Sequence, residues 1–110
     1  LSNTLKPTFP DGLDTEIFSF GTLKIMNDSA DLVSEREHVT SYIRNNMKLF
    51  KVHNFVNTKD LSNLRWTVDE KRDLVFVKRI YLEMRPSVLF SMRDVLRVIS
   101  KNPRISKINH

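Results

Sequence analysis

Asp69 is the residue best placed for chemistry in this sequence. It follows residues 64–68, a short apolar run typical of a buried strand, and precedes a helical pattern that begins at Glu70. Ligands of open α/β folds bind at the carboxyl ends of the strands, where one exposed carboxylate and phosphate oxygens can hold Mg²⁺. From spacing alone the favoured interpretation of Asp69 is as the N-cap of the helix, and the two roles are compatible. Asp73, one turn later, is expected to stabilise the start of the helix through its charge.

Two further groups of polar side chains are candidates for ligand binding. Asp11, Asp14 and Glu16 form an acidic group around a tight turn. Carboxylates at a strand edge are good acceptors for sugar hydroxyls, although a solvated acidic loop explains the group equally well. Arg36 and His38 lie in the expected first turn of a helix, where the helix dipole favours an anionic ligand. Ordinary surface placement is the alternative for both.

Several common kinds of site are excluded by composition. Gly12 and Gly21 are the only glycines, so neither a G-x-G-x-x-G loop nor a P-loop can be present. The chain therefore encodes no known backbone cradle for a triphosphate. The three histidines are too widely spaced to be a metal-ligand set, and the lack of cysteine rules out disulfides and thiolate metal sites.

The net charge of +5 is unevenly distributed along the chain. Residues 1–40 carry three Lys or Arg and seven acids, a net charge of −4, whereas residues 41–110 carry fifteen and six, a net charge of +9. A basic half can bind nucleic acid. The basic residues, however, recur at helical intervals among apolar ones, with no continuous basic block. This pattern favours a solvated helix face, and nucleic acid is not expected as a partner.

The elements that would position these residues alternate in type. The order is strand, helix, helix, strand, strand, helix, helix, which predicts an α/β or α+β class in one domain. The last two helices have the clearest signals, an apolar repeat at three and four residues and a capping Ser91 with Asp94 three residues later. The expected strands are 14–20, 49–56 and 64–68, and the expected helices are 21–27, 34–46, 70–84 and one from Ser91 to just before Pro103.

The motifs together resemble the carboxyl-terminal half of cytidylyltransferase-like proteins, especially the spore coat polysaccharide biosynthesis protein F type. The chain is more distantly similar to 3-deoxy-manno-octulosonate and acylneuraminate cytidylyltransferases. The resemblance runs from about Ser2 to the end of the chain. It rests on Ser2-Asn3-Thr4, Pro10-Asp11-Gly12-Leu13-Asp14 with Glu16, Ser34-Glu35-Arg36-Glu37-His38-Val39-Thr40, Tyr42-Ile43, Asp60-Leu61-Ser62, and Leu64-Arg65-Trp66-Thr67-Val68-Asp69 with Asp73-Leu74.

The resemblance implies a fold, a reaction and a set of site residues. The fold would be α/β: the carboxyl-terminal half of a Rossmann-type sandwich like that of nucleotide-diphospho-sugar transferases, with residues 1–110 as a single partial domain of about three strands and four helices. The reaction would join CTP and a sugar into a CMP-sugar and pyrophosphate, in surface polysaccharide biosynthesis. Asp69 would hold Mg²⁺, and four residues would bind the sugar: Asp14, Glu16, Arg36 and His38.

The resemblance also implies what this chain would lack. The phosphate-binding loop and a further metal-binding Asp of the family lie in its amino-terminal half, so no catalytic residue is assigned here and the chain alone is expected to be inactive. The competing interpretation is a non-catalytic half-domain that associates with a partner, with the missing amino-terminal half or with a second copy as a homodimer. No apolar run approaches the roughly 20 residues of a membrane span, and no signal peptide is visible, so we expect no membrane partner and a cytoplasmic location.

Overall fold

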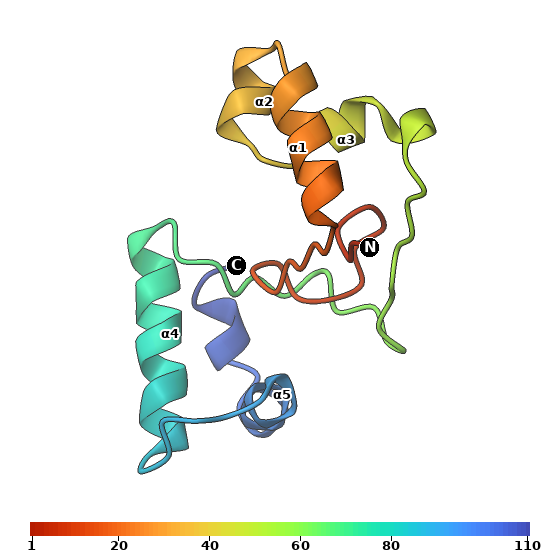
Figure 1. Ribbon diagram of the computed structural model, residues 1–110. Coiled ribbons are helices and arrows are strands. Elements are labelled where there is room, and N and C mark those ends of the chain that lie inside the picture. The colour runs from red at the N-terminus through yellow and green to blue at the C-terminus, as the bar shows by residue number, and fades with distance from the viewer. The chain divides into compact units, whose positions relative to one another are not determined.

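The computed structural model describes residues 1–110 and consists of helices joined by long irregular segments (Figure 1). The chain divides into two compact units. The first unit is Leu1–Pro7 with Asp14–Thr58, and the second unit is Thr8–Leu13 with Lys59–His110. The helical elements, in chain order, are α1 (Phe20–Ser29), α2 (Val33–Glu37), α3 (Ser41–Asn45), the 3-10 turn η1 (Met47–Leu49), α4 (Lys71–Met84), α5 (Met92–Lys101) and the 3-10 turn η2 (Ile105–Lys107).

The predicted fold class, a Rossmann-type α/β sandwich with about three strands, is wrong. No strand forms over 14–20, 49–56 or 64–68. Alternating residues indicate an extended, half-buried segment, but a strand also needs a neighbour whose backbone continues the hydrogen-bond ladder. Here each contact stops after one residue pair. The structure has three isolated bridges: Ser2 with Glu16, Ser2 with Asn54, and Asp11 with Arg65.

Helix α1 begins earlier and ends later than the predicted 21–27. Ser19 is its N-cap, and the Ser19 hydroxyl accepts a hydrogen bond from the backbone N–H of Thr22 at 3.1 Å. This cap satisfies one of the amide groups that a helix start leaves unpaired. Phe20, expected as the last strand residue, is therefore the first residue of the helix and is 81% exposed. Met26 is the buried residue of α1.

The single helix predicted over 34–46 is divided into two short helices. Glu35, rather than Glu37, reaches back to the helix start: its carboxylate accepts a hydrogen bond from the backbone N–H of Leu32 at 3.5 Å. The same buried carboxylate accepts a hydrogen bond from the side chain of Asn45 at 2.7 Å. His38 is in an extended conformation and ends α2. The buried Glu35 thus joins α2 to α3 across the break. Helix α2 begins at Val33, one residue before the predicted cap Ser34.

The second unit contains the main hydrophobic core. Four residues from α4, α5 and η2 form it: Phe76, Ile80, Val95 and Ile105. Trp66, which the sequence predicted to be a core residue, packs against this cluster and is partly buried. Helix α4 starts one residue after the predicted 70, and α5 starts directly after Ser91, whose hydroxyl accepts from the backbone N–H of Asp94. The expectations for these two helices are confirmed.

Helix α4 is the longest, with 14 residues. At about 1.5 Å per residue it extends roughly 20 Å, well short of the roughly 30 Å of a bilayer core. None of the helices has both the length and the hydropathy of a membrane-spanning segment.

Candidate functional site

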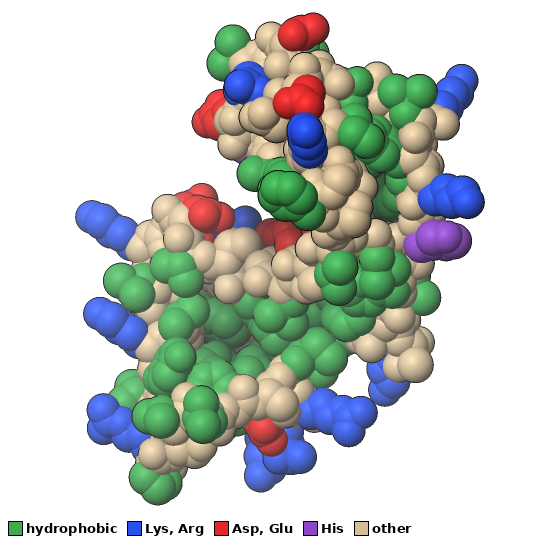
Figure 2. Space-filling model, in the orientation of Figure 1, with side chains coloured by type: hydrophobic (Ala, Val, Ile, Leu, Met, Phe, Trp, Pro, Cys, Tyr) green, Lys and Arg blue, Asp and Glu red, His purple; other side chains and the backbone are tan.

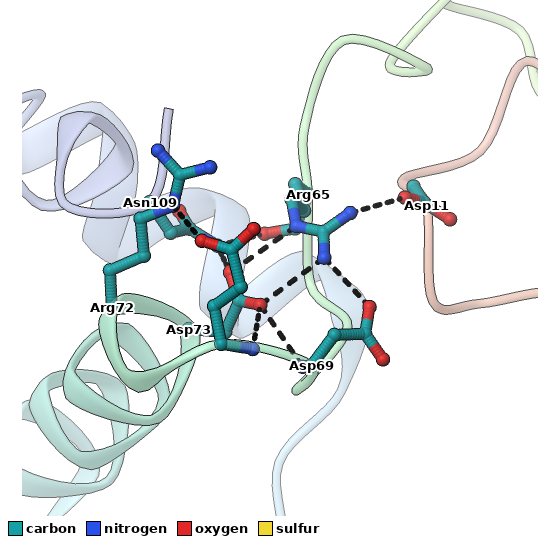
Figure 3. Close-up of polar contacts among 7 residues, drawn as sticks. Asp11, Arg65, Asp69, Arg72, Asp73 and Asn109 are labelled. Atoms are coloured by element: carbon teal, nitrogen blue, oxygen red, sulfur yellow. Dashed lines mark hydrogen bonds and ion pairs between the residues drawn. The ribbon is translucent and has the colours of Figure 1, made fainter.

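Asp69 lies in the turn before α4, with its carboxylate directed toward the side chain of Arg65 (Figure 3). The Asp69 side chain is 67% exposed, and its Oδ2 accepts a hydrogen bond from Arg65 Nη2 at 2.7 Å. No hydrogen bond or ion pair involves Oδ1. The prediction that Asp69 caps the helix is wrong, because the N-cap is Glu70 and the helix begins at Lys71. Asp69 is thus held on one oxygen and open on the other.

Asp73, in the first turn of α4, accepts the backbone hydrogen bonds that stabilise the start of this helix. Its side chain is fully buried, and Oδ2 accepts hydrogen bonds from the backbone N–H groups of Asp69 at 3.0 Å and Glu70 at 2.9 Å. Hydrogen bonding to Arg65 is the main reason that the pKa of Asp73 is held well below its ordinary value, with further contributions from these two amides and from Asn109. The prediction that Asp73 stabilises the start of this helix is confirmed. Its negative charge also anchors the surrounding network.

Arg65 connects three carboxylates from separate parts of the second unit. Its Nε donates to Asp73 Oδ1 at 3.3 Å, its Nη2 to Asp73 Oδ2 at 3.2 Å as well as to Asp69, and its Nη1 contacts Asp11 Oδ2 at 3.5 Å. Asn109 completes the arrangement by donating to the Arg65 backbone oxygen at 2.7 Å and to Asp73 Oδ1 at 3.2 Å. These bonds hold the guanidinium group at a fixed place beside Asp69 (Figure 3).

The turn that carries Asp11 is fastened to the segment before Asp69 by its backbone. Asp11 N donates to Leu64 O at 2.8 Å, and Trp66 N donates to Asp11 O at 2.7 Å. Gly12 has a φ of 102°, and a Cβ there would lie 2.8 Å from backbone atoms of Trp66 and Thr67. Only glycine fits both the conformation and the space. The Pro10-Asp11-Gly12 sequence thus places Asp11 on the Arg65 side of the site.

The donors around Asp69 fit a cation shared with a ligand, not one held by the protein alone. No group of three or more His, Cys, Asp or Glu side chains is arranged to hold a metal ion. Asp69 nevertheless offers one exposed carboxylate oxygen, and Mg²⁺ is commonly bound by one or two carboxylates while phosphate oxygens and water complete its shell. The chemistry of this donor set is therefore compatible with Mg²⁺ that arrives bound to phosphate.

In the first unit, Glu16 is the centre of a second polar cluster. Glu16 Oε1 receives hydrogen bonds from Arg44 Nη2 at 3.3 Å and from the hydroxyls of Ser2 and Thr4 at 3.4 Å. Arg44 also donates to the Thr4 hydroxyl at 2.9 Å. Partial burial raises the pKa of Glu16, but hydrogen bonds from Thr40 and Arg44 outweigh it and leave the pKa below its ordinary value. Glu16 is therefore ionised and ready to accept hydrogen bonds at neutral pH.

Two hollows meet at this cluster. Glu16 and His38, both predicted as sugar-binding residues, line a shallow pocket of about 550 Å³ together with Thr40 and Arg44. Glu16, Thr40 and Arg44 also line a pocket of about 290 Å³ whose other walls include the apolar side chain of Phe50. The structure thus places Glu16 and His38 in the same pocket, and Glu16 also lines the second, partly apolar pocket.

The other two predicted sugar-binding residues lie elsewhere in the first unit. Asp14 is exposed and lines neither pocket. Arg36 donates from Nη1 to the backbone oxygen of Asn27 at 2.7 Å and so ties α2 to the end of α1. Asp69 belongs to the second unit, whereas the four predicted sugar-binding residues belong to the first.

Three residues of these clusters were missed by the sequence interpretation: Arg44, Arg65 and Asn109. Arg44 lies two residues after Tyr42 in the motif region, and its position in a predicted basic helix face made it resemble a solvated cation. Arg65 was assigned to a strand, although its spacing of four residues before Asp69 and eight before Asp73 is a usable signal for an ion-pair network. Asn109 has no signal, because its contacts span 36 and 44 residues.

No protein-family model matches the chain. A solved structure, that of a cytidylyltransferase from Leptospira borgpetersenii serovar Hardjo-bovis, is similar to 99% of this chain with a TM-score of 0.90 and 34% identity, and the match covers 45% of that protein. An uncharacterized protein, MJ1063 from Methanocaldococcus jannaschii, is 33% identical over 103 residues, which cover 89% of this chain and 41% of the relative. The chain spans less than half the length of both.

The structural similarity covers 99% of the chain, in both units. It supports the resemblance to cytidylyltransferases that the motifs indicate, and a nucleotidyltransferase-like function with it. The finer assignments, to a branch of that family and to particular substrates, are taken up as a proposal.

Proposed function

We propose that this chain supplies the metal-binding and sugar-binding residues of a sugar cytidylyltransferase that serves surface polysaccharide biosynthesis, nearest to the spore coat polysaccharide biosynthesis protein F type. The observation that carries the proposal is the match of 99% of the chain to a solved cytidylyltransferase at a TM-score of 0.90. The proposed reaction forms a bond between a sugar hydroxyl oxygen and the α-phosphorus of CTP, breaks the bond to the β-phosphate oxygen, and releases pyrophosphate and a proton.

Each of the two polar clusters has a role in the proposal. Asp69 would hold Mg²⁺ through its free Oδ1, and the ion when bound would neutralise charge on the phosphates. Glu16, ionised and fixed by Arg44, would accept hydrogen bonds from sugar hydroxyls. His38 would donate or accept at the same pocket. Positioning of the two substrates supplies much of the rate in such a transfer.

The proposal assigns no catalytic role to this chain acting alone. A nucleotide-binding loop rich in glycine is not encoded in it, and the chain covers 45% of the solved cytidylyltransferase. We therefore expect no CMP-sugar from purified chain with CTP, Mg²⁺ and a panel of sugars. Formation of a CMP-sugar by the purified chain would contradict this part of the proposal.

A chimaera tests the positive part. This chain would replace the matching 45% of the Leptospira cytidylyltransferase, and pyrophosphate release would be measured with CTP and a panel of sugars. We expect transfer by the chimaera and a loss of at least about 100-fold on Asp69→Asn, which corresponds to about 3 kcal/mol of transition-state stabilisation. Asp31→Asn, an exposed carboxylate outside both clusters, is the matched control. A folded chimaera that keeps full activity after Asp69→Asn would refute the role of Asp69.

Association with a second polypeptide is the alternative function, and the exposed apolar side chains favour it. Phe20, Val33 and Leu89 are each more than 80% exposed, and contiguous exposed apolar patches mark interaction sites. Figure 2 shows apolar side chains gathered on one face over α4 and α5, with Lys and Arg at its margin. Sedimentation of the purified chain tests self-association, and a monomer at high concentration would exclude the homodimer.

A further inference from the structure

We propose that Arg65 determines the form in which a divalent cation reaches Asp69: as a complex with a polyphosphate, and not as the free ion. The inference rests on the proposed function, which assigns Asp69 as the cation ligand. It concerns a different residue, however, and can fail while that assignment holds. Arg65 is in this sense a specificity-determining residue of the site.

The first argument is the placement of the positive charge. Arg65 Nη2 lies 2.7 Å from Asp69 Oδ2, which leaves Oδ1 as the oxygen open to a cation. A cation bound there would have a guanidinium group on the opposite oxygen of the same carboxylate. Repulsion at such separations lowers the affinity for a free divalent cation by about tenfold, even at the dielectric constant of water. A cation already carrying a polyphosphate has a net negative charge, so the sign of this interaction is reversed.

The second argument is that Asp73 does not supply an alternative acidic ligand. Its two oxygens are buried and accept hydrogen bonds from Asp69 N, Glu70 N, Asn109 Nδ2 and Arg65. A cation would have to displace these donors and open the start of α4. Of the two carboxylates at the start of α4, Asp69 is therefore the one with a free and accessible oxygen, whereas the third carboxylate, Asp11, contacts Arg65 from a separate turn.

The third argument is that part of the guanidinium group can change partner. Arg65 is 31% exposed, and the contact of its Nη1 with Asp11 Oδ2 is the longest in the network, at 3.5 Å, with a partner that is 47% exposed. A phosphate oxygen can replace Asp11 there and form a shorter charge-assisted hydrogen bond. The bonds of Nε and Nη2 to the buried Asp73 meanwhile keep the group in place.

The backbone N–H groups of Asp69 and Glu70, directly before α4, do not provide the phosphate contact, because both donate to the buried Asp73 carboxylate. Among the side chains, Arg65 is the cation held within hydrogen-bond distance of the Asp69 carboxylate (Figure 3).

The test is a pair of binding titrations on the full chain, followed by electron paramagnetic resonance of Mn²⁺ as a substitute for Mg²⁺. One titration uses Mn²⁺ alone and the other Mn²⁺ with inorganic tripolyphosphate. For Arg65→Gln we expect the affinity for free Mn²⁺ to rise about tenfold and the affinity for the tripolyphosphate complex to fall about tenfold. Arg65→Lys keeps the positive charge but not the planar fork, so we expect the affinity for free Mn²⁺ to stay within about threefold of the parent and the affinity for the tripolyphosphate complex to fall.

Opposite changes in the two affinities separate this proposal from a purely structural role. If Arg65 only held the turn at Asp11 against α4, its replacement would weaken both kinds of binding or neither, and either result would overturn the proposal. Failure of the parent chain to bind the tripolyphosphate complex at all would overturn it too. Arg65→Gln also leaves the buried Asp73 carboxylate without its cation, so circular dichroism must accompany the titrations.

A second variant keeps the test decisive if Arg65→Gln does not fold. The double variant Arg65→Gln/Asp73→Asn removes the buried negative charge along with the guanidinium, and the amide oxygen at position 73 can still accept from Asp69 N and Glu70 N. The same opposite changes are expected. Asp69→Asn, in the parent and in each variant, should abolish binding of free Mn²⁺. Unchanged Mn²⁺ binding in Asp69→Asn would refute the assignment of Asp69, and thus the proposed function, independently of the result for Arg65.

Discussion

The Arg65 cluster of the second unit is built around a buried carboxylate, whereas the Glu16 cluster of the first unit lies at the edge of open pockets. Asp73 is inaccessible and is bonded on both oxygens, so Arg65 and Asp69 take their places from it. Glu16 and Arg44 are joined by one contact of 3.3 Å with side chains 25% and 49% exposed. The difference indicates a preformed geometry where a cation is proposed to bind and an adaptable one where a sugar is proposed to bind.

The second unit is also the more densely packed of the two in its apolar residues. Four buried apolar residues form a continuous core in the second unit, while Met26 is the one fully buried large apolar residue of the first unit. Stability is not uniform across such a molecule, and the less densely packed region opens at lower free energy. The predictions below test whether the two units differ in this way.

The largest expected effect is that of Phe76→Ala in the core of the second unit. Phe76 is 2% exposed, and its truncation should lower the free energy of unfolding by about 3–5 kcal/mol. Fluorescence of Trp66, the one tryptophan, which packs against this core, reports on the unit during urea unfolding. Leu89→Ala, at an 88% exposed position, should change it by less than about 0.5 kcal/mol. Equal effects of the two substitutions would mean that this core is not formed as described.

Gly12→Ala is expected to release the turn of Asp11 from the Arg65 network. A methyl group there would meet backbone atoms at 2.8 Å in a conformation that alanine rarely adopts, at a cost of about 1–3 kcal/mol. Hydrogen exchange should increase at Asp11 and Trp66, whose amides bond across this contact. Gly21→Ala is the matched control, because its Cβ meets only the Ser19 hydroxyl at 3.7 Å and should stabilise α1 slightly. Unchanged exchange at Asp11 in Gly12→Ala would contradict the prediction.

The acid sensitivity of the second unit is expected to depend on Asp73. Because the folded-state pKa of Asp73 lies below its ordinary value of 3.8, the ionised carboxylate stabilises the folded state. That contribution is complete above the unfolded pKa and is lost as the pH falls below it. The parent should therefore lose stability, measured by Trp66 fluorescence, between about pH 5 and pH 2. Asp73→Asn should be less stable at neutral pH but have a flatter pH profile. Parallel profiles would show that Asp73 does not control acid stability.

The helices of the second unit were predictable because their signals are local. The apolar repeat of α4 and the pairing of Ser91 with Asp94 at the start of α5 need no distant partner. Expected strands depend on neighbours that the pattern of one segment does not specify, and none formed here. Similarly, the 34–46 segment is divided into two helices, and the hydrogen bond that joins them, from Asn45 to Glu35, spans ten residues. The pattern around Ser34 does not reveal this partner.

The candidate sites were predictable only where the signal is local in the sequence. Glu16 and His38 were selected from motifs and do share a pocket, but Arg36, chosen from the same helix start, is engaged by the end of α1. The sequence singled out Asp69 by its position before a helix, yet the N-cap fell on Glu70. Side-chain partners such as Arg44 and Arg65 depend on how segments dock, and spacing alone did not distinguish them from solvated cations.

The smallest expected effect is that of Arg44→Ala on the stability of the first unit. The exposed ion pair with Glu16 contributes less than about 1 kcal/mol, since solvent screens it and both side chains lose mobility to form it. Hydrogen exchange of α1 and α3 should therefore change little. Glu16 should nevertheless become more mobile, because Arg44 is its ion-pair partner. Arg44→Lys, which keeps the charge, is the matched control for this loss of orientation. A loss above about 2 kcal/mol in Arg44→Ala would mean that the Glu16 pocket is as rigidly held as the Arg65 network, and the contrast between the two units would then be wrong.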